Sequence, residues 1–401
     1  SSSGGNPFFI EEILKHWAEH ELLRKEEGRW TLSGEGFHKL EVPANVAAVL
    51  QRRVGRLSQT ARDVAGWLAV LNRATPKELL EAVASPGPAK LEEAIRGLVS
   101  RQMIRGVTVD GEDCVEFRHA LIADVIRKDL PPERRRRMHA KIAEALEKRC
   151  GAGARLQELA LHLTEGRCGE KAIQYALKAA DACKAEYAHE AALRFYEYIL
   201  RNRGSLSQEQ LSEVAIDAAA ACCALGVPKR GIKILAPELR KARTTDPDIK
   251  ARMFAQTAFS YQHLGNLREL SKWARRGLSL FAAPHPAQNQ ITKALLLLHS
   301  SYPATLRCSP REALALLDEA LAAAVESENK DLMGRVLSMI GVEHRIAGNL
   351  RSAVAAGRQA HRIMQMSQDP VAASIIPSNL GVTQTAGTAE AMGKIYQSLG
   401  P

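Results

Sequence analysis

A repeat of about 40 residues in the rear half of the chain constrains the fold more than any other feature. Five stretches share one pattern, in which a small residue and a helix are followed by a turn, a second small residue and a second helix. Aligned on one position of the second helix, they fall at Ala192, Gly231, Leu270, Ala313 and Ala353, with spacings of 39, 39, 43 and 40 residues. Helix pairs that repeat at such a period stack into a solenoid, because no pair buries its apolar face alone. The sequence therefore predicts a helical array over residues 161–401.

Two of these stretches also share a turn, since Gly265-Asn266-Leu267 and Gly348-Asn349-Leu350 occupy the same place in the alignment. The pattern resembles tetratricopeptide repeats, in which small residues let the helices approach and Gly-Asn forms a left-handed turn. The period exceeds the about 34 residues of that family, so longer helices are expected. The alternative is that an Ala- and Leu-rich helical chain produces such matches by chance. The concave surface of the array is the expected binding site for a protein or a small-ligand effector.

A different order of elements precedes the repeats. Helical spacing of apolar residues begins at Ala44, and Ser58 is placed to cap a second helix. Helices over 76–83 and 89–101 follow, and then two runs of period two flank Asp110-Gly111, which predicts a β-hairpin. Helices followed by one hairpin indicate a winged-helix-like domain over 42–130, with residues 91–101 in the place of the recognition helix.

The remaining segments are assigned by continuity. Residues 131–160 are predicted to be connecting helices. In 1–41 a helix from Phe8 to about Arg24 is expected, followed by an extended piece at 28–32. The chain starts without Met and ends within a segment that reads as helical, so a fragment is expected.

Composition agrees with a mainly α protein of several cores, because aromatic residues make up only 5% of 401 residues and hydrophobic residues 46%. The seven cysteines are scattered and never spaced C-x-x-C, which predicts neither disulfides nor a zinc site. His16 and His20 lack the order of a zinc protease, so no metal is expected. No run approaches the roughly 18 apolar residues of a membrane span and no signal peptide is evident, so a soluble, cytoplasmic chain without membrane contact is predicted.

The net charge of +10 would favour binding to nucleic acid or to acidic partners. The run Arg134-Arg135-Arg136-Arg137 could grip phosphates beside a winged helix. Consecutive residues point around a helix, however, so a solvated or interdomain surface is the favoured interpretation. The predicted recognition helix offers Arg96 and Arg101 against two glutamates. DNA binding, with the repeats mediating dimerisation, is the alternative function.

Three features together resemble the signal-transducing NTPases called STAND proteins: Gly5-Asn6-Pro7-Phe8-Phe9, then Phe117-Arg118-His119 after the hairpin, then the repeats. Among them the chain is most similar to bacterial multidomain regulators, in which an AAA-type ATPase precedes tetratricopeptide repeats and is fused to a kinase, a cyclase or a LuxR-type domain. The resemblance implies that 1–41 is the end of the ATPase module, its helical lid. It also implies that Pro7 packs on the adenine of bound nucleotide.

By the same resemblance, His119 contacts the β-phosphate of ADP and locks the inactive state, and Arg118 is a weaker phosphate candidate. Ala120 stands where plant disease-resistance proteins have aspartate, which is a departure from that family's motif. The alternatives for these residues are structural: Pro7 as a helix-starting proline, and His119 as a helix cap or a packed core residue.

No phosphate loop G-x-x-x-x-G-K-[ST] occurs, and Gly226 to Lys233 fails at the lysine and hydroxyl positions. No nucleophile motif or carboxylate pair stands out, so no catalytic residue is predicted. ATP or ADP would be held mainly by a missing upstream domain. The predicted function is the regulatory and sensor portion of an ATP-dependent signalling protein, and self-association is a further option. A plain repeat scaffold without nucleotide is the third hypothesis.

Overall fold

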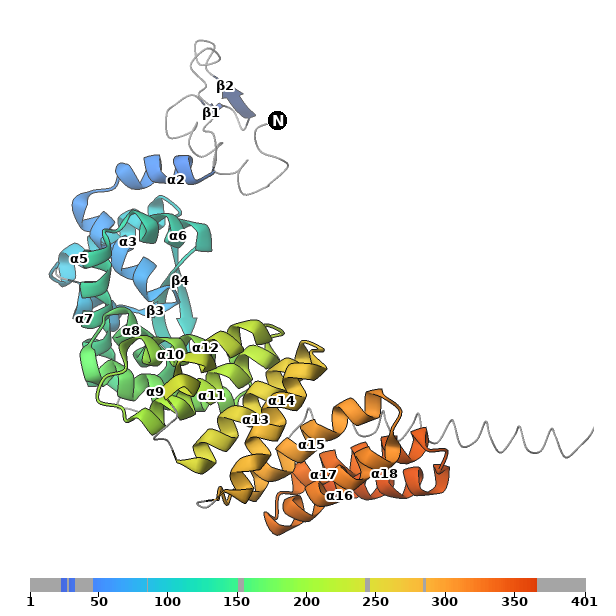
Figure 1. Cartoon of the computed structure of the whole chain (residues 1–401). Helices are drawn as coiled ribbons and strands as arrows, with labels where there is room; N and C mark the ends of the chain where they lie inside the picture. The colour runs from blue at the N-terminus through green and yellow to red at the C-terminus, as the bar shows by residue number, and fades with distance from the viewer. Residues whose placement is uncertain are drawn as a thin grey trace, which may run out of the picture. The chain divides into compact units, whose positions relative to one another are not determined.

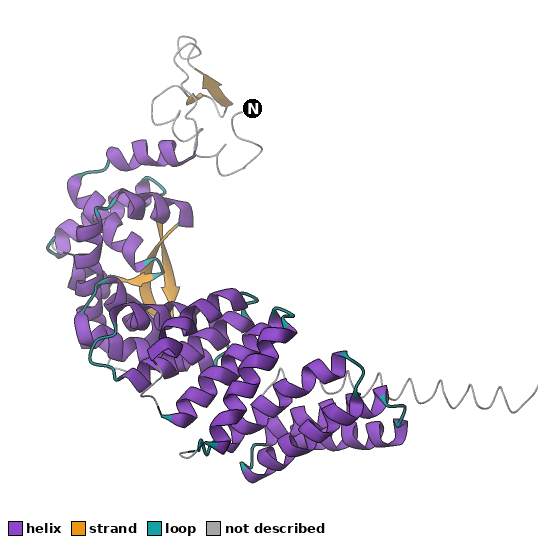
Figure 2. Cartoon of the chain, in the orientation of Figure 1, coloured by secondary structure: helices purple, strands orange, loops and turns teal. Residues whose placement is uncertain are grey.

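The computed structural model describes residues 23–26, 29–32, 46–84, 86–150, 155–241, 246–283 and 286–365. These residues form seventeen α-helices, one 3-10 helix and five short strands (Figure 2). The predicted fold class, mainly α with a winged-helix-type domain before an array of helix pairs, is confirmed. The chain divides into two compact units, one up to Lys178 and one from Ala179 onward.

The first described residues form a hairpin. Strand β1 (Leu23–Glu26) pairs antiparallel with β2 (Arg29–Leu32), and Leu23 lies opposite Leu32. The predicted helix to about Arg24 is therefore wrong at its end, whereas the extended piece at 28–32 is confirmed over β2. Trp30 and Thr31 of β2 are both strand-favouring residues, which suits an extended pair better than a continued helix. Residues 1–22, Pro7 included, lie outside the described part of the chain.

The first unit continues as alternating helices and short strands. Its elements are α2 (Val46–Gly55), α3 (Gln59–Leu71), β3 (Thr75–Pro76), α4 (Lys77–Val83), α5 (Pro88–Ser100), β4 (Ile104–Val109), β5 (Glu112–Phe117), α6 (Ala120–Asp129), α7 (Pro132–Cys150), α8 (Leu156–Glu165) and the first part of α9 (Gly169–Ala185).

Local signals explain most of these boundaries. The Ser58 hydroxyl accepts a hydrogen bond from the Ala61 amide at 3.2 Å and so starts α3 as predicted. Asp110 and Gly111 take φ of 52° and 79°, both in the left-handed region that a two-residue hairpin turn requires. Strands β4 and β5 pair from Ile104 opposite Phe117 to Val109 opposite Glu112.

A third strand, which the sequence did not indicate, completes the sheet. Thr75 pairs with Val115 and Pro76 with Cys114, so the strand order is β3-β5-β4. At two residues β3 is too short to show alternation, and its proline reads as a helix start. Helix, strand, two helices and a hairpin in this order make a winged helix, and its core is formed by fully buried leucines of α3, α4 and α5.

The second unit is helical throughout its described residues. It holds the end of α9, then α10 (His189–Asn202), α11 (Gln208–Ala224), α12 (Pro228–Lys241), α13 (Pro247–His263), α14 (Leu267–Leu278), the 3-10 helix η2 (Ser279–Ala282), α15 (Gln290–Leu306), α16 (Pro310–Glu326), α17 (Lys330–Ile346) and α18 (Leu350–Met364).

These helices stack in chain order (Figure 1). Each helix from α10 to α18 contacts the next one, and α11, α13, α15 and α17 also contact one another in sequence. The five aligned positions all fall on second helices, and all five are buried. Gly265 and Gly348 have φ of 69° and 78°, as the predicted left-handed turns require. The predicted helix-pair repeat is therefore confirmed, with first helices of 17 residues in α11, α13, α15 and α17.

Gly231 shows why a small residue is needed at its own place in the alignment, although Leu270 occupies the equivalent place in the next pair. A Cβ atom placed there would lie 3.1 Å from both the Cα and the carbonyl oxygen of Ala219 on α11, and backbone atoms cannot rotate away. We expect Gly231→Val to lower the free energy of unfolding by roughly 1–3 kcal/mol through overpacking. Gly97→Ala in α5 is the control, because nothing lies within 4 Å of its Cβ position. Gly97→Ala should raise the free energy of unfolding by about 0.5–1 kcal/mol, because alanine favours the helix more than glycine does. Urea unfolding followed by circular dichroism measures both, and equal effects would contradict the close approach.

Candidate functional site

The residues predicted to contact nucleotide lie at the start of α6 and in the undescribed N-terminal part. His119 is the N-cap residue of α6, directly after the wing hairpin; it is half-buried and its side chain does not cap the helix. Arg118 is exposed, and its backbone amide donates to the Met103 carbonyl at 3.1 Å. The structural alternative of a capping side chain is thus excluded for His119. Because Pro7 lies outside the described residues, its place relative to the other two stays a prediction.

The surface predicted for DNA in the alternative function is not strongly basic. Along α5 and at its C-cap residue Arg101, the exposed charged residues are three basic and two acidic, which leaves a net charge of only +1: Lys90, Arg96 and Arg101 against Glu92 and Glu93. Lys77 of α4 also forms an ion pair with Glu92 at 3.5 Å. A helix that reads DNA has to present net positive charge to phosphates, so this face offers little for that purpose.

The arginine run is also engaged within the first unit. Arg134 forms an ion pair with Asp63 of α3 at 2.7 Å, and Arg136 forms one with Glu133 at 3.3 Å. The Arg135 guanidinium donates to the backbone carbonyl of Arg127 at 3.5 Å. These contacts agree with the prediction that the four arginines do not form one flat basic patch.

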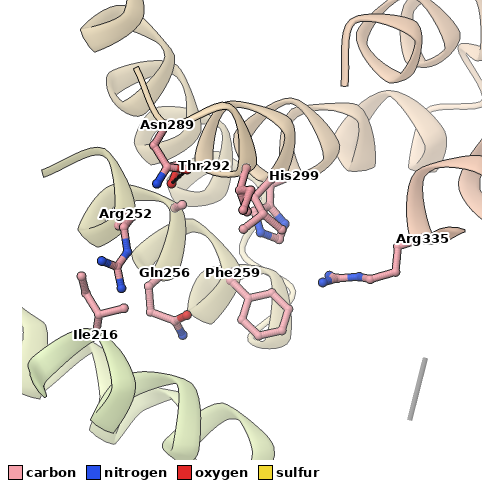
Figure 3. A pocket seen from close by; sticks show the side chains of 11 residues that line it. Ile216, Arg252, Gln256, Phe259, Asn289, Thr292, His299 and Arg335 are labelled. Atoms are coloured by element: carbon pink, nitrogen blue, oxygen red, sulfur yellow. Dashed lines mark hydrogen bonds between the residues drawn. The ribbon is translucent and has the colours of Figure 1, made fainter. Parts of the chain in front are cut away.

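The second unit contains a pocket of about 410 Å³ (Figure 3). It is formed by side chains of four successive first helices and the residue that caps α15. The lining residues are Ile216 of α11; Arg252, Ala255, Gln256 and Phe259 of α13; Asn289, Ile291, Thr292, Leu295 and His299 of α15 and its cap; and Arg335 of α17.

Helical spacing explains why these side chains converge. Arg252, Gln256 and Phe259 follow at intervals of four and three residues, as do Thr292, Leu295 and His299 at three and four, which places each set on one face of its helix. Since α13 and α15 contact each other and each also contacts another first helix, their inward faces combine into one surface. The sequence predicted a binding surface on the array but none of these residues.

The charged groups that line the pocket are cationic. Arg252 and Arg335 enter it from opposite sides, with Gln256 and Phe259 between them (Figure 3). Arg252 forms an ion pair with Glu213 of α11, which lies outside the lining. No aspartate or glutamate is among the eleven lining residues. The pocket therefore presents guanidinium groups beside apolar side chains.

His299 contributes a neutral imidazole. It is 5% exposed, and its Nδ1 atom lies 2.8 Å from Oε1 of Gln262, so Nδ1 donates and Nε2 is left as an acceptor. Burial, together with the nearby charges of Arg335 and His263, lowers the pKa of His299 to about 3. The ring of Phe259 packs against it, with centroids 5.4 Å apart. The imidazole is thus uncharged at neutral pH.

The rim at the start of α15 is held by a set of hydrogen bonds. The Asn289 side-chain oxygen accepts from the Thr292 amide at 2.9 Å and from the Thr292 hydroxyl at 3.1 Å. Asp248 Oδ1 accepts from the backbone amides of Gln288 and Asn289 at 2.7 and 2.8 Å. Because these bonds fix the cap of α15 to the start of α13, the pocket wall is preorganised.

Other parts of the described chain offer less. A second cavity of about 550 Å³ lies between α4 and α7 in the first unit, but its lining mixes Glu78 and Glu144 with Lys141, Lys148 and Arg149.

Within the described ranges, no group of three or more His, Cys, Asp or Glu residues could hold a metal ion. The six cysteines whose side chains are described are free thiols. None of the described helices is long and apolar enough to cross a membrane.

No family model matches the chain. An uncharacterized protein of Rhizobium meliloti (strain 1021) is 28% identical over 217 residues, which cover 53% of this chain and 20% of that protein. The chain therefore spans about a fifth of the length of this curated relative.

Three solved structures are similar in part. A STAND protein with a tetratricopeptide repeat sensor from Pyrococcus horikoshii has a TM-score of 0.40 at 14% identity, covering 94% of this chain and 57% of its own. Aspartyl phosphate phosphatase F from Bacillus subtilis has a TM-score of 0.46 at 9% identity, covering 90% and 85%. BtubC from P. vanneervenii has a TM-score of 0.40 at 16% identity, covering 55% and 84%. At these values the likenesses assign no function to the chain.

Proposed function

We propose that this chain is the regulatory and sensor portion of a cytoplasmic signal-transduction ATPase of the STAND type. The repeats bind an effector. Two separate parts of the chain, one with Pro7 and the other with Arg118 and His119, respond to the nucleotide state of an ATPase domain. The observation that carries the proposal is the pocket on a helix-pair array that follows a winged-helix domain in the same chain. Such arrays use their surfaces for binding, and the pocket marks the part of the surface where we expect the effector to bind.

The coupling in this proposal is a shift between two populations. An effector changes the nucleotide state only if it binds one conformation better than the other, and the difference in affinity limits the effect. A pocket built from four successive helix pairs suits this role, because its shape depends on how those pairs stack. DNA binding by the winged helix has less support, since the exposed charges of α5 and its C-cap leave a net charge of only +1.

The nucleotide part of the proposal predicts an effect of His119. In a polypeptide that joins this chain to an upstream ATPase domain, His119→Ala and Pro7→Ala should each weaken ADP binding. A lost hydrogen bond to a phosphate is worth about 1.5–3 kcal/mol, so His119→Ala should raise the dissociation constant by about 10- to 100-fold. Isothermal titration calorimetry with ADP gives this number directly.

The control for that measurement is His361→Ala, which removes a half-buried histidine from α18 in the second unit. It should leave ADP affinity unchanged. If His119→Ala and Pro7→Ala behave like the control, both residues have structural roles only, and the repeats bind their effector without a nucleotide lock at these positions.

A further inference from the structure

We infer that the pocket lined by α11, α13, α15 and α17 binds a small organic anion that carries an apolar group. This inference rests on the proposed function, since it names the chemical class of the effector that the repeats would sense. The anionic group would meet the guanidiniums of Arg335 and Arg252, and the apolar group would pack on Phe259 and Leu295.

The size of the pocket favours a small molecule. A volume of about 410 Å³ falls within the roughly 300–1,000 Å³ of small-molecule sites. A peptide would follow the first helices beyond this pocket and would need a longer groove. The preorganised cap of α15 also suits a compact ligand, because a preformed wall reduces the entropy lost on binding.

The charge of the lining favours an anion. Two guanidiniums face the space and no lining residue is acidic, so a cationic ligand would be repelled. Guanidinium groups bind carboxylate or phosphate with paired hydrogen bonds, which are stronger than those to neutral acceptors. The ion pair with Glu213 offsets part of the charge of Arg252 and holds its side chain in place, and its remaining guanidinium N–H groups can still donate to an anion.

The uncharged part of the lining favours a ligand that is not purely ionic. Ile216, Ala255, Phe259, Ile291 and Leu295 supply an apolar wall. The side-chain amide of Gln256 donates one N–H to Sγ of Cys223 at 3.7 Å, which leaves its second N–H to donate, and the acceptor nitrogen of His299 can receive a hydrogen bond. Burying an apolar group contributes about 25 cal/mol per Å², so an inorganic anion alone would leave much of this site unused.

The test compares probes that share a phenylalkyl group and differ in the charge and chemistry of their polar head group. Saturation-transfer NMR and calorimetry on the whole 401-residue chain would use phenylbutyrate, phenylbutyl phosphate, phenylbutanol and phenylbutylamine. We expect both anions to bind at least about tenfold more tightly than the alcohol, and the amine not to bind. The ratio between the two anions distinguishes a carboxylate ligand from a phosphate ester.

Two variants assign the effect to the pocket. Arg335→Gln should lower the preference for anion over alcohol, because one of the two lining guanidiniums is removed, whereas Arg268→Gln, which removes an exposed arginine from the second helix α14, should leave it intact. Phe259→Ala should weaken the anions and the alcohol by the same factor, because it removes only apolar contact. Thermal unfolding of each variant establishes that the array is still folded.

The outcomes separate the inference from the proposed function. Equal binding of alcohol and anions, unchanged in Arg335→Gln but weakened in Phe259→Ala, would overturn the anion inference and leave the pocket as a sensor site. Absence of binding by all four probes up to their solubility limits would overturn the inference and also the role of this pocket in the proposed function. A charge preference that Arg268→Gln abolishes as well would show attraction to the array as a whole, and would overturn the site.

Discussion

Acidification below about pH 6.5 should destabilise both units steeply, because three buried histidines stay neutral in the folded chain. The pKa of His299 is lowered to about 3, mainly by burial and also by Arg335 and His263. In the first unit, burial also lowers the pKa of His162 to about 3 and that of His139 to about 4. The unfolded chain protonates all three near pH 6.5.

The sign follows from the protons bound in each state. Between about pH 6.5 and these lowered pKa values the unfolded chain binds more protons than the folded chain, so stability falls as the pH falls. Above that window all three are neutral in both states and contribute no pH dependence. At about pH 5, His299 alone should cost the second unit roughly 2 kcal/mol, taking about 1.4 kcal/mol per pH unit.

The histidine pair of the first unit gives this effect a geometric reason. His139 of α7 and His162 of α8 face each other with their Nδ1 atoms 2.9 Å apart, and both are buried. One ring donates this hydrogen bond and the other accepts it. Two protonated rings would each present a donor, and their charges would repel. Glu165 partly offsets the shift of His139, whereas Arg135, Arg127 and, for His162, Arg73 add to it.

Urea unfolding at pH 7.5, 6, 5 and 4.5 tests this expectation. His299→Gln should cost stability at pH 7.5 but should make the second unit less dependent on pH, because the titrating group is gone. His361→Gln, at a half-buried position on α18, should change neither the stability at pH 7.5 nor its pH dependence. If His299→Gln keeps the full acid dependence, a group other than His299 controls the acid sensitivity of that unit.

Tyr196 should produce opposite effects depending on what replaces it. Its side chain lies in α10 and is 2% exposed, and its hydroxyl finds no hydrogen-bond partner among the described residues. Tyr196→Ala should lower the free energy of unfolding by about 3–5 kcal/mol, since it leaves a cavity the size of an aromatic ring. Tyr196→Phe should raise that energy by about 1 kcal/mol, because a buried hydroxyl without a partner is removed.

The environment of this hydroxyl supports the second half of the prediction. Burial and the carboxylates of Asp217 and Asp181 raise the pKa of Tyr196, so the group stays protonated and apolar replacement removes no charge. Tyr187→Phe and Tyr187→Ala are the matched controls, since Tyr187 is 46% exposed. Both should change stability by less than about 0.5 kcal/mol. A loss of stability in Tyr196→Phe would mean that its hydroxyl is solvated or bonded.

Periodicity carried most of the fold prediction, because buried positions in stacked helices repeat along the sequence. The turns could be predicted from a different signal. Gly265, Gly348 and Asp110-Gly111 all take a positive φ, which few residue types other than glycine adopt readily. Strand β3 and the hairpin of β1 and β2 have too few residues to show a period. The helix predicted up to Arg24 failed there because apolar content alone does not separate helix from strand.

The pocket could not be predicted, because its members come from helices far apart in the chain. Arg252 and Arg335 are ordinary surface arginines when read along the sequence, and they acquire a shared role only through the stacking of α13, α15 and α17. The opposite holds for the nucleotide residues. Pro7 and His119 were named from a sequence resemblance, and their role stays a proposal after the structure has been described.

A pocket that spans consecutive helix pairs also limits how the chain can change in evolution. Duplication or loss of a pair is tolerated in a linear array, because each unit touches only its neighbours. A pair inserted between α14 and α15 would move Arg335 away from Arg252 and divide the lining into two incomplete halves. Relatives that share this pocket should therefore vary in length beyond α17 or before α11, and should keep the number of helices between those two fixed.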